Sequence, residues 1–309
     1  MKVAVLAGGR SLERQVSLQS GARATDALER LGHEVSELDV DAGLVGSLRA
    51  LEPDVAFIAL HGPGGEDGTI QELLEILAIP HTGPSVAACA RCMDKAAAKH
   101  LLRGAGIATP DSVSFSRTAF RELGAADALG EITDRLGLPL VVKPASQGSA
   151  LGVGFAADPE SVPAALLSAF SYGERVLIER HVRGRELAVG ILDGEPLEIV
   201  EIRPREQDRF NYDARYEIGR TDYVCPAELT SAEADAVRTA AVSSCEALGV
   251  GGFPRVDLIL DQDGPQVLEI EAIPGLTDTS LVPMAAEASG LDFEQLCERI
   301  LSGAVAPPG

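Results

Sequence analysis

The chain has 309 residues, of which 46% are hydrophobic and 24% are charged, and its formal net charge is −21. That hydrophobic share is enough for a packed core and argues against a disordered chain. The acidic balance argues against nucleic-acid binding through a broad basic surface, and no apolar run approaches the ~18 residues that a membrane span needs.

The five cysteines are scattered along the chain, and only Cys89 and Cys92 have CxxC spacing. No second pair and no histidine cluster accompanies them, so we interpret the cysteines as unpaired thiols. The opening apolar run, Val3–Ala7, is too short for a signal peptide. These features predict a protein of the reducing cytoplasm.

Residues 1–92 show strands that alternate with helices. The expected strands are Lys2–Ala7, Glu34–Asp39 and Val55–Leu60, and the expected helices include Ala24–Leu31 and Thr69–Leu77. This alternation predicts an α/β domain with a parallel sheet and right-handed crossovers. A polar connection at 84–95 is expected to lead out of it.

The next two units, 93–184 and 185–309, predict an α+β arrangement, because their strands are separated by turns as well as by helices. In the central unit we expect a helix at Ala96–Ala105, strands at Leu138–Pro144 and Val176–His181, and a Gly/Ser-rich turn at 146–154. In the C-terminal unit we expect strands at Glu186–Leu192, Leu197–Arg203, Val256–Leu260 and Gln266–Glu271, and a helix at Ser231–Leu248.

The last two strands should form a hairpin around the turn residues Asp263-Gly264. If Leu260 pairs with Gln266, Asp257 faces Glu269 across the ladder, and Glu271 lies further along the same face. Three carboxylates on one face repel each other unless a hard divalent cation such as Mg²⁺ lies over them. Spacing alone leaves one alternative to a metal site, namely a solvent-exposed strand face that carries ordinary surface carboxylates.

The chain has only four lysines, Lys2, Lys95, Lys99 and Lys143. Lys143 ends an apolar strand, and the Gly/Ser-rich turn follows it at once, so backbone N–H groups and a cation lie together. Lys95 stands at the start of an expected helix, where anions are stabilised. Two lysines therefore lie where a phosphate site would need them.

Taken in order, several stretches resemble the D-alanine–D-alanine ligase family of the ATP-grasp superfamily. They are LAGGRSLERQVSLQSG (6–21), ALHGPGGEDGTIQ (59–71), MDK (93–95), VVKPASQGS (141–149), VLIER (176–180), NYDARY (211–216), CPAEL (225–229), RVDLIL (255–260) and EIEAIPGLTDTSLVPMAAEASG (269–290). The resemblance covers nearly the whole length and implies three domains: 1–92 with the parallel sheet, 93–184 as the central ATP-grasp domain, and 185–309 with the metal site and a lid.

The resemblance also implies an ATP site and a metal site. Lys95 and Lys143 match phosphate-binding lysines, and Glu179 and Val182 match residues at the adenine edge. Glu186 matches the residue that accepts hydrogen bonds from the ribose hydroxyls. The remaining expected nucleotide contacts are Arg215 and Leu268. Asp257, Glu269 and Glu271 stand where the family holds Mg²⁺ or Mn²⁺.

For the amino-acid substrates, Glu13 matches the residue that binds the ammonium group of the first D-alanine. Ser149 and Tyr216 match residues that are hydrogen-bonded to that glutamate. The other matches are Arg255 and Gly275 at the oxyanion, Ser280 and Leu281 at the second D-alanine, and His61 in the wall of the pocket.

The activity that the resemblance implies is ATP-dependent joining of two D-alanines through an acyl phosphate, for peptidoglycan precursors, by a cytoplasmic enzyme that is expected to be a homodimer. The charged segment Arg205–Thr221 is the expected lid. Three positions depart from the family pattern: Glu271 replaces Asn, Arg215 replaces Lys, and Ala150 replaces Ser. They leave two alternatives open, a ligase for a different acceptor and a nucleotide-binding paralogue without catalysis.

Overall fold

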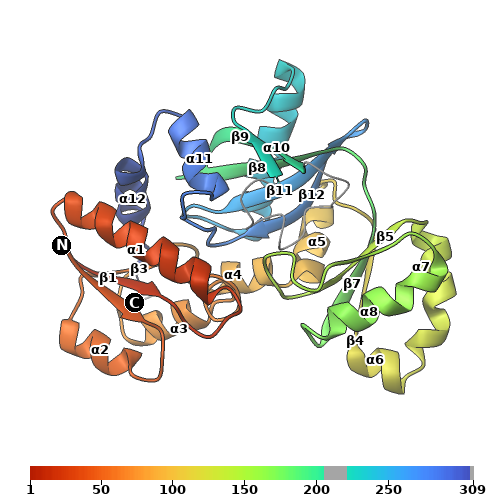
Figure 1. Cartoon of the computed structure of the whole chain (residues 1–309), viewed down its shortest axis with the longest axis horizontal. Coiled ribbons are helices and arrows are strands. Elements are labelled where there is room, and N and C mark those ends of the chain that lie inside the picture. The colour runs from red at the N-terminus through yellow and green to blue at the C-terminus, as the bar shows by residue number, and fades with distance from the viewer. Residues whose placement is uncertain (205–220, 307–309) are drawn as a thin grey trace.

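The computed structural model describes residues 1–204 and 221–306, and these residues form three β-sheets (Figure 1). The first sheet is parallel with the order β2-β1-β3, the second is antiparallel with the order β10-β9-β8-β11-β12, and the third is antiparallel with the order β4-β7-β5-β6. One α/β unit and two α+β units were predicted, and this architecture confirms them.

The elements have the following bounds. The strands are β1 Lys2–Ala7, β2 Glu34–Asp39, β3 Val55–Ile58, β4 Ser112–Ser116, β5 Leu140–Pro144, β6 Gly154–Ala156, β7 Arg175–Arg180, β8 Arg185–Leu192, β9 Glu195–Pro204, β10 Thr221–Val224, β11 Arg255–Asp261 and β12 Gly264–Glu271. The helices are α1 Arg14–Arg30, α2 Leu44–Leu51, α3 Thr69–Ile76, α4 Val86–Met93, α5 Lys95–Gly104, α6 Arg117–Glu122, α7 Leu129–Leu136, α8 Val162–Phe170, α10 Ser231–Leu248, α11 Leu281–Ala288 and α12 Phe293–Ser302.

The parallel sheet forms because β1 is apolar and almost wholly buried, with β2 and β3 hydrogen-bonded on its two sides. Helix α1 packs on β1 and β2, and α12 at the end of the chain packs on α1. The predicted bounds of β1 and β2 are confirmed. Helix α4 occupies the stretch that we expected to be a polar connection, and the Ser85 side chain caps its first turn.

The hairpin of β11 and β12 brings the predicted carboxylates together. Asp257 is the register partner of Glu269, as predicted, although Leu260 lies opposite Pro265 and not opposite Gln266. A β-bulge next to Asp257 accommodates the one-residue difference, so the predicted offset is wrong near the turn and correct at the carboxylates.

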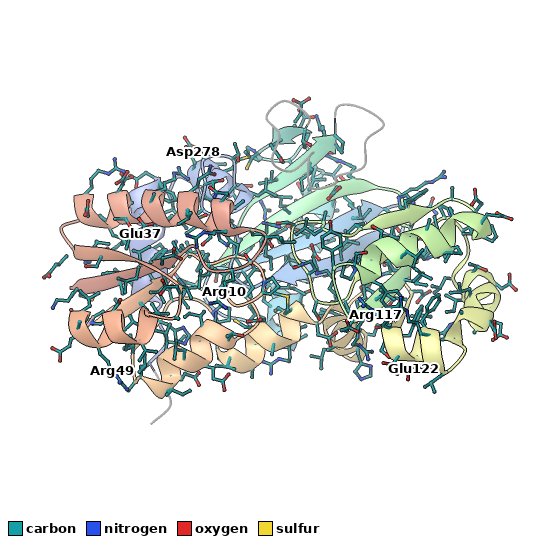
Figure 2. The ribbon with its side chains drawn as sticks, turned by 60° about the horizontal axis from the view of Figure 1, so that its bottom comes forward. Arg10, Glu37, Arg49, Arg117, Glu122 and Asp278 are labelled. Carbon is teal, nitrogen blue, oxygen red and sulfur yellow. The ribbon has the colours of Figure 1, made fainter. Side chains whose placement is uncertain are left out.

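The four-stranded sheet has its own hydrophobic core, formed mainly with α8 and α7, whereas a single core is shared by the parallel sheet and the five-stranded sheet. Helix α5 packs against α10 and β12 of the five-stranded sheet. The four-stranded sheet and its helices therefore project to one side. Figure 2 shows this by Arg117 and Glu122 of α6, which lie at the opposite end of the molecule from Arg49 of α2. The domain bounds at 93 and 185 stay a prediction.

In residues 1–204 and 221–306, no helix is both long and apolar enough to cross a membrane.

The packing of α1 on β1 depends on Gly21. A Cβ atom at this position would lie 2.5 Å from the Cβ of Ala7, which is too close for two carbon atoms. Gly21→Ala should therefore lower the free energy of unfolding by about 1–3 kcal/mol, despite the better helix propensity of alanine. The matched control is Gly46→Ala on α2, where a Cβ would meet no atom within 4 Å; it should stabilise the chain by about 0.5–1 kcal/mol. Urea denaturation measures both, and equal effects would contradict the close packing.

Candidate active site

A cleft of ≈ 820 Å³ lies between the four-stranded and the five-stranded sheets. We call it the large cleft. It is lined by every residue within the described ranges that the sequence predicted for the nucleotide, namely Lys95, Lys143, Glu179, Val182, Glu186 and Leu268, and also by Glu269. Arg215 lies outside the described residues.

Glu179 lies at the back of the large cleft between two lysines. Its carboxylate oxygens are 2.6 Å from Nζ of Lys143 and 2.9 Å from Nζ of Lys99. Burial opposes ionisation of Glu179, but the two ammonium groups outweigh it and lower the pKa of the carboxyl. Glu179 is therefore a buried, ionised carboxylate.

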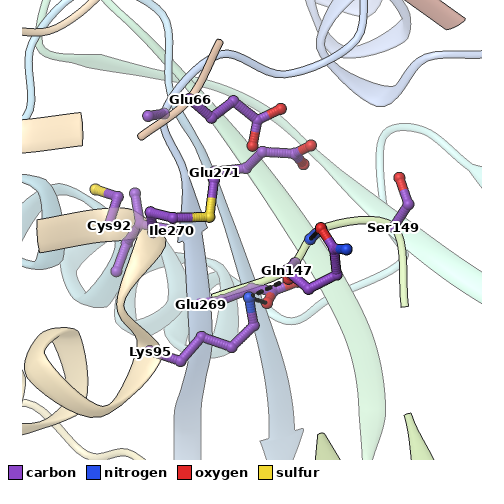
Figure 3. Close-up of a pocket in the computed structure, with 11 residues that line it drawn as sticks. Glu66, Cys92, Lys95, Gln147, Ser149, Glu269, Ile270 and Glu271 are labelled. Carbon is purple, nitrogen blue, oxygen red and sulfur yellow. Dashed lines mark hydrogen bonds and ion pairs between the residues drawn. The ribbon is translucent and has the colours of Figure 1, made fainter. Parts of the chain in front are cut away.

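Lys95 begins α5, whose first turn is capped by the side chain of Asp94. Its ammonium group donates a hydrogen bond of 2.8 Å to the carbonyl of Gln147 and lies 2.9 Å from the carboxylate of Glu269 (Figure 3). Burial disfavours the charge on Lys95, but Glu269 outweighs it and raises the pKa of the lysine. This charge lies where the Gly/Ser-rich turn meets the hairpin.

The predicted metal ligands all pair with basic side chains. Arg255 makes two hydrogen bonds to Asp257, of 2.6 and 2.8 Å, and also contacts the carboxylate of Glu271, while Glu269 pairs with Lys95. Burial works against the charge of Arg255, but the neighbouring carboxylates raise the pKa of its guanidinium group.

Within the described part of the chain, no group of three His, Cys, Asp or Glu side chains is already gathered closely enough to hold a metal ion. The chemistry of the donors nevertheless suits a hard cation, since Asp257, Glu269 and Glu271 offer only oxygen ligands. A cation could reach all three carboxylates only if these side chains move away from Arg255 and Lys95.

Glu66 is a buried carboxylate that the sequence did not single out. It lines a narrow cavity of ≈ 20 Å³ together with Lys95, Ser149, Glu269 and Glu271, and Figure 3 shows the carboxylates of Glu66 and Glu271 beside each other. Burial, and then the charges of Glu271 and Glu13, raise the pKa of Glu66 well above its usual range. Its position within the GGEDG motif was the only feature that could have identified it.

Glu13 directly precedes α1 and is buried in a space that glycines leave open. The hydroxyl of Ser149 donates a hydrogen bond to its carboxylate, as the sequence predicted for this pair. A Cβ atom added at Gly148 or at Gly62 would lie 2.6 or 2.8 Å from Oε1 of Glu13. Both glycines are therefore required by the close approach of the carboxylate. Tyr216, the other expected partner, lies outside the described residues.

His61 joins the parallel sheet to the loop after β12. Its Nε2 lies 2.9 Å from Oγ of Ser20 and its Nδ1 lies 3.1 Å from the carbonyl of Ile273. Because the carbonyl of Ile273 can only accept, Nδ1 carries the ring proton and donates it, and Nε2 of the neutral ring accepts from the hydroxyl of Ser20. Burial lowers the pKa of His61 to about 4, so the ring is neutral near pH 7.

A further cavity, of ≈ 50 Å³, gathers most of the residues predicted for the amino-acid substrates, whereas Ser149 lines the narrow cavity. We call it the small cavity; its predicted lining residues are Glu13, His61, Arg255, Gly275, Ser280 and Leu281. Tyr223 and Glu271 also line it. Ser280 is held in place because its hydroxyl accepts a hydrogen bond of 3.0 Å from the N–H of Thr277.

The loop that carries these residues is fixed by Arg23 of α1, which the sequence did not single out. Its guanidinium group donates to the carbonyls of Leu276 and Thr277, pairs with Asp278 and lies 3.7 Å from the centre of the Phe293 ring. No motif indicates this role, because the partners are about 250 residues away in the sequence.

Glu66→Gln should stabilise the free protein, and increasingly so as the pH rises. The pKa of Glu66 is higher in the folded chain than in the unfolded chain, so ionisation above about pH 4.3 costs stability that glutamine would not lose. Thermal unfolding from about pH 5 to about pH 8, without nucleotide or metal, measures the difference.

The control for this experiment is Glu122→Gln, an exposed residue at the far end of the molecule. Because this side chain is exposed, its substitution should change the free energy of unfolding by less than about 0.5 kcal/mol. If Glu66→Gln is equally stabilising at all pH values, or destabilising, Glu66 is not held in its protonated form.

Comparisons with known proteins match the chain over almost its whole length. Residues 45–84 match the family model described as D-ala D-ala ligase N-terminus, and residues 101–302 match the one described as D-ala D-ala ligase C-terminus. A D-alanine–D-alanine ligase from Anaeromyxobacter dehalogenans is 46% identical over 98% of this chain and 96% of its own length.

Two solved structures share the fold. The Bacillus anthracis D-alanine–D-alanine ligase complexed with ATP has a TM-score of 0.83 and 32% identity, over 98% of this chain and 97% of that one. The VanG D-Ala:D-Ser ligase from Enterococcus faecalis has a TM-score of 0.82 and 27% identity, over 98% of each chain. On sequence identity and coverage together, this chain belongs to the D-alanine–D-alanine ligase family.

Proposed function

We propose that this protein joins two D-alanines to D-alanyl-D-alanine, at the expense of ATP, for peptidoglycan precursor synthesis. The observation that carries the proposal is that its three cavities adjoin. The narrow cavity shares Lys95, Gln147 and Glu269 with the large cleft, and it shares Glu271 with the small cavity. A nucleotide in the large cleft could therefore direct its terminal phosphate towards an amino acid in the small cavity.

In the large cleft, Lys95 and Lys143 bind the phosphate groups of ATP, and Glu179 and Val182 lie at the adenine. Glu186 accepts hydrogen bonds from the ribose hydroxyls, and the neighbouring wall of the cleft includes Leu268. The two lysines offset the negative charge that moves with the transferred phosphoryl group.

Asp257, Glu269 and Glu271 would hold a divalent cation, Mg²⁺ or Mn²⁺, after nucleotide entry. Bound there, the cation would lower the repulsion between the phosphate oxygens and the attacking carboxylate. The basic side chains that now pair with these carboxylates, Arg255 and Lys95, are then available to the substrates.

In the small cavity, Glu13 binds the ammonium group of the first D-alanine, and Ser149 keeps the glutamate in place through its hydrogen bond. The carboxylate of this D-alanine attacks the γ-phosphate of ATP, the bond between the γ-phosphorus and the β-phosphate oxygen breaks, and an acyl phosphate and ADP form. The amine of the second D-alanine, placed by Ser280 and Leu281, then attacks the acyl carbon, and phosphate leaves.

The oxygen of the tetrahedral intermediate becomes negatively charged in that second step. Arg255 of β11 and Gly275 in the loop after β12 both line the small cavity, and we assign the oxyanion to the guanidinium group of Arg255 and the backbone N–H of Gly275. Neutral His61 keeps this loop in position through Ile273. The acyl phosphate must be protected from water, which is the role we assign to the predicted lid, Arg205–Thr221, of which 205–220 lie outside the described residues.

The decisive experiment is phosphate release from ATP and Mg²⁺ with D-alanine, with L-alanine and with no amino acid. D-alanine alone should drive turnover, and mass spectrometry should detect the dipeptide. Glu13→Gln should lower kcat/KM for D-alanine by at least about tenfold, since a charge-assisted hydrogen bond to the ammonium group is lost. Equal turnover with L-alanine or without any amino acid would rule out the proposal.

A second candidate is a ligase that joins D-alanine to another acceptor. It is favoured by the likeness to the VanG D-Ala:D-Ser ligase and by Glu271 and Arg215, which depart from the family pattern. The same assay with D-serine or D-lactate beside D-alanine distinguishes the two, and Tyr216 favours dipeptide formation over ester formation. A chain that binds ATP and releases no phosphate with any acceptor would be a paralogue without catalysis.

The place of action and the assembly complete the proposal. We propose the cytoplasm, where ATP is available and where the five free thiols stay reduced. We also propose a homodimer, which sedimentation of the purified chain would test.

Glu271→Asn tests the third metal ligand. We expect the variant to stay active and to need about two- to tenfold more Mg²⁺ for half-maximal rate, because one oxygen ligand loses its charge. The effect should stay modest, since the carboxylate attracts the cation and repels the phosphate groups with similar energies. Glu122→Gln, far from the site, should titrate as the wild type does. If the Mg²⁺ titrations of Glu271→Asn and wild type overlay, Glu271 is not a metal ligand, and its role is limited to the ion pair with Arg255.

A further inference from the structure

Among the described residues, Lys99 is the most deeply buried ionised side chain near the large cleft, and neither the sequence motifs nor the proposed reaction gives it a role. It lies on α5 and is 1% exposed. It is absent from the lining of the large cleft, which Lys143 and Glu179 do line. A buried lysine is costly unless its charge is paired, so the contacts of Lys99 need an explanation.

The ammonium group of Lys99 makes two contacts that fix its position. It donates a hydrogen bond of 2.7 Å to Oγ1 of Thr109, whose own hydroxyl donates to the carbonyl of Val267 on β12. It also lies 2.9 Å from Oε2 of Glu179 on β7. Lys99 is thus held by the five-stranded sheet on one side and faces the carboxylate of the four-stranded sheet on the other.

The charges around Glu179 add up to one excess positive charge. Glu179 carries one negative charge, while Lys99 and Lys143 each carry one positive charge, at 2.9 and 2.6 Å. Without Lys99, Glu179 and Lys143 would form a closed pair with no net charge. An ammonium group that is neutralised at 2.6 Å attracts a phosphate only weakly, because the carboxylate repels the same anion.

We propose that Lys99 is a positioning residue of the nucleotide site, which neutralises Glu179 from behind so that Lys143 keeps its positive charge for the phosphate groups. This inference rests on the proposed binding of a nucleotide in the large cleft. Lys99 itself touches no substrate; it acts through Glu179.

The test uses ADP binding to the full-length protein, measured by calorimetry at a fixed Mg²⁺ concentration. Lys99→Met should weaken ADP binding by about tenfold or more, since one buried charge is removed close to the phosphate site. Lys99→Arg, which keeps the charge, should bind ADP better than Lys99→Met. The matched control is Lys2→Met, on the parallel sheet and far from the large cleft, which should bind ADP as the wild type does.

The double variant Lys99→Met, Glu179→Gln separates the electrostatic role from a merely structural one. Glutamine keeps a carbonyl oxygen as hydrogen-bond acceptor, but it does not neutralise Lys143. ADP binding should therefore recover most of what Lys99→Met loses. If the double variant binds ADP as weakly as Lys99→Met, or if Lys99→Met binds as the wild type does, the inference is wrong.

A thermal unfolding curve of each variant shows whether that variant is folded. Should Lys99→Met alone fail to fold, the double variant decides, because the ammonium group that remains in it, Lys143, lines the large cleft: wild-type-like binding supports the inference, and weak binding overturns it. If the wild type itself binds no ADP, the proposed function fails first, so the two failures are distinguishable.

The pH dependence of ADP binding gives an independent readout. Burial lowers the pKa of Lys99 to about 8, and the groups that face it are Glu179 on β7, Lys143 on β5 and Arg103 on its own helix. Wild-type affinity should fall as the pH rises through about 8, while the phosphate groups stay ionised. In Lys99→Arg this fall should be absent, because arginine keeps its proton. An identical fall in both proteins would assign it to another group and contradict the role of Lys99.

Discussion

The arrangement of this site depends on the neutralisation of buried carboxylates by a small number of basic side chains. A carboxylate that loses its hydration without a partner costs several kcal/mol, so each one fixes a cation beside it. Glu179 holds Lys99 and Lys143, Glu269 holds Lys95, and Asp257 shares Arg255 with Glu271. Three of the four lysines of this acidic chain are therefore committed to one region.

These ion pairs lie where elements from different parts of the chain meet, so they also determine the relative position of the sheets. Lys99 reaches from α5 to β7, and its partner Thr109 is bonded to β12. On the opposite side, Arg23 and His61 attach the parallel sheet and α1 to the loop after β12. The hairpin of β11 and β12 is thus contacted from both sides, and its carboxylates stay at the junction of the three cavities.

Local patterns were enough to predict the parallel sheet, the long helix α10 and the pairing of Asp257 with Glu269. They were not enough to show the bulge, because a one-residue insertion leaves the alternation of the strand intact on both sides. Glu66 and Lys99 were missed as site residues for a different reason. Their burial and their pKa values arise from neighbours that are far away in the sequence. One amino-acid sequence does not show which charged side chains will be in contact in the fold.

The surplus of carboxylates also bears on the order in which the substrates can enter. Among the described residues that line the narrow cavity, Glu66, Glu269 and Glu271 carry carboxylates and Lys95 carries an ammonium group, and the raised pKa of Glu66 favours its neutral form. A triphosphate that approaches such a site meets repulsion unless positive charge comes with it. The ammonium group of the first D-alanine at Glu13 and a divalent cation at the hairpin would supply that charge. On the proposed function, the same carboxylates would therefore favour the binding of ATP together with the metal and the amino acid over the binding of ATP alone.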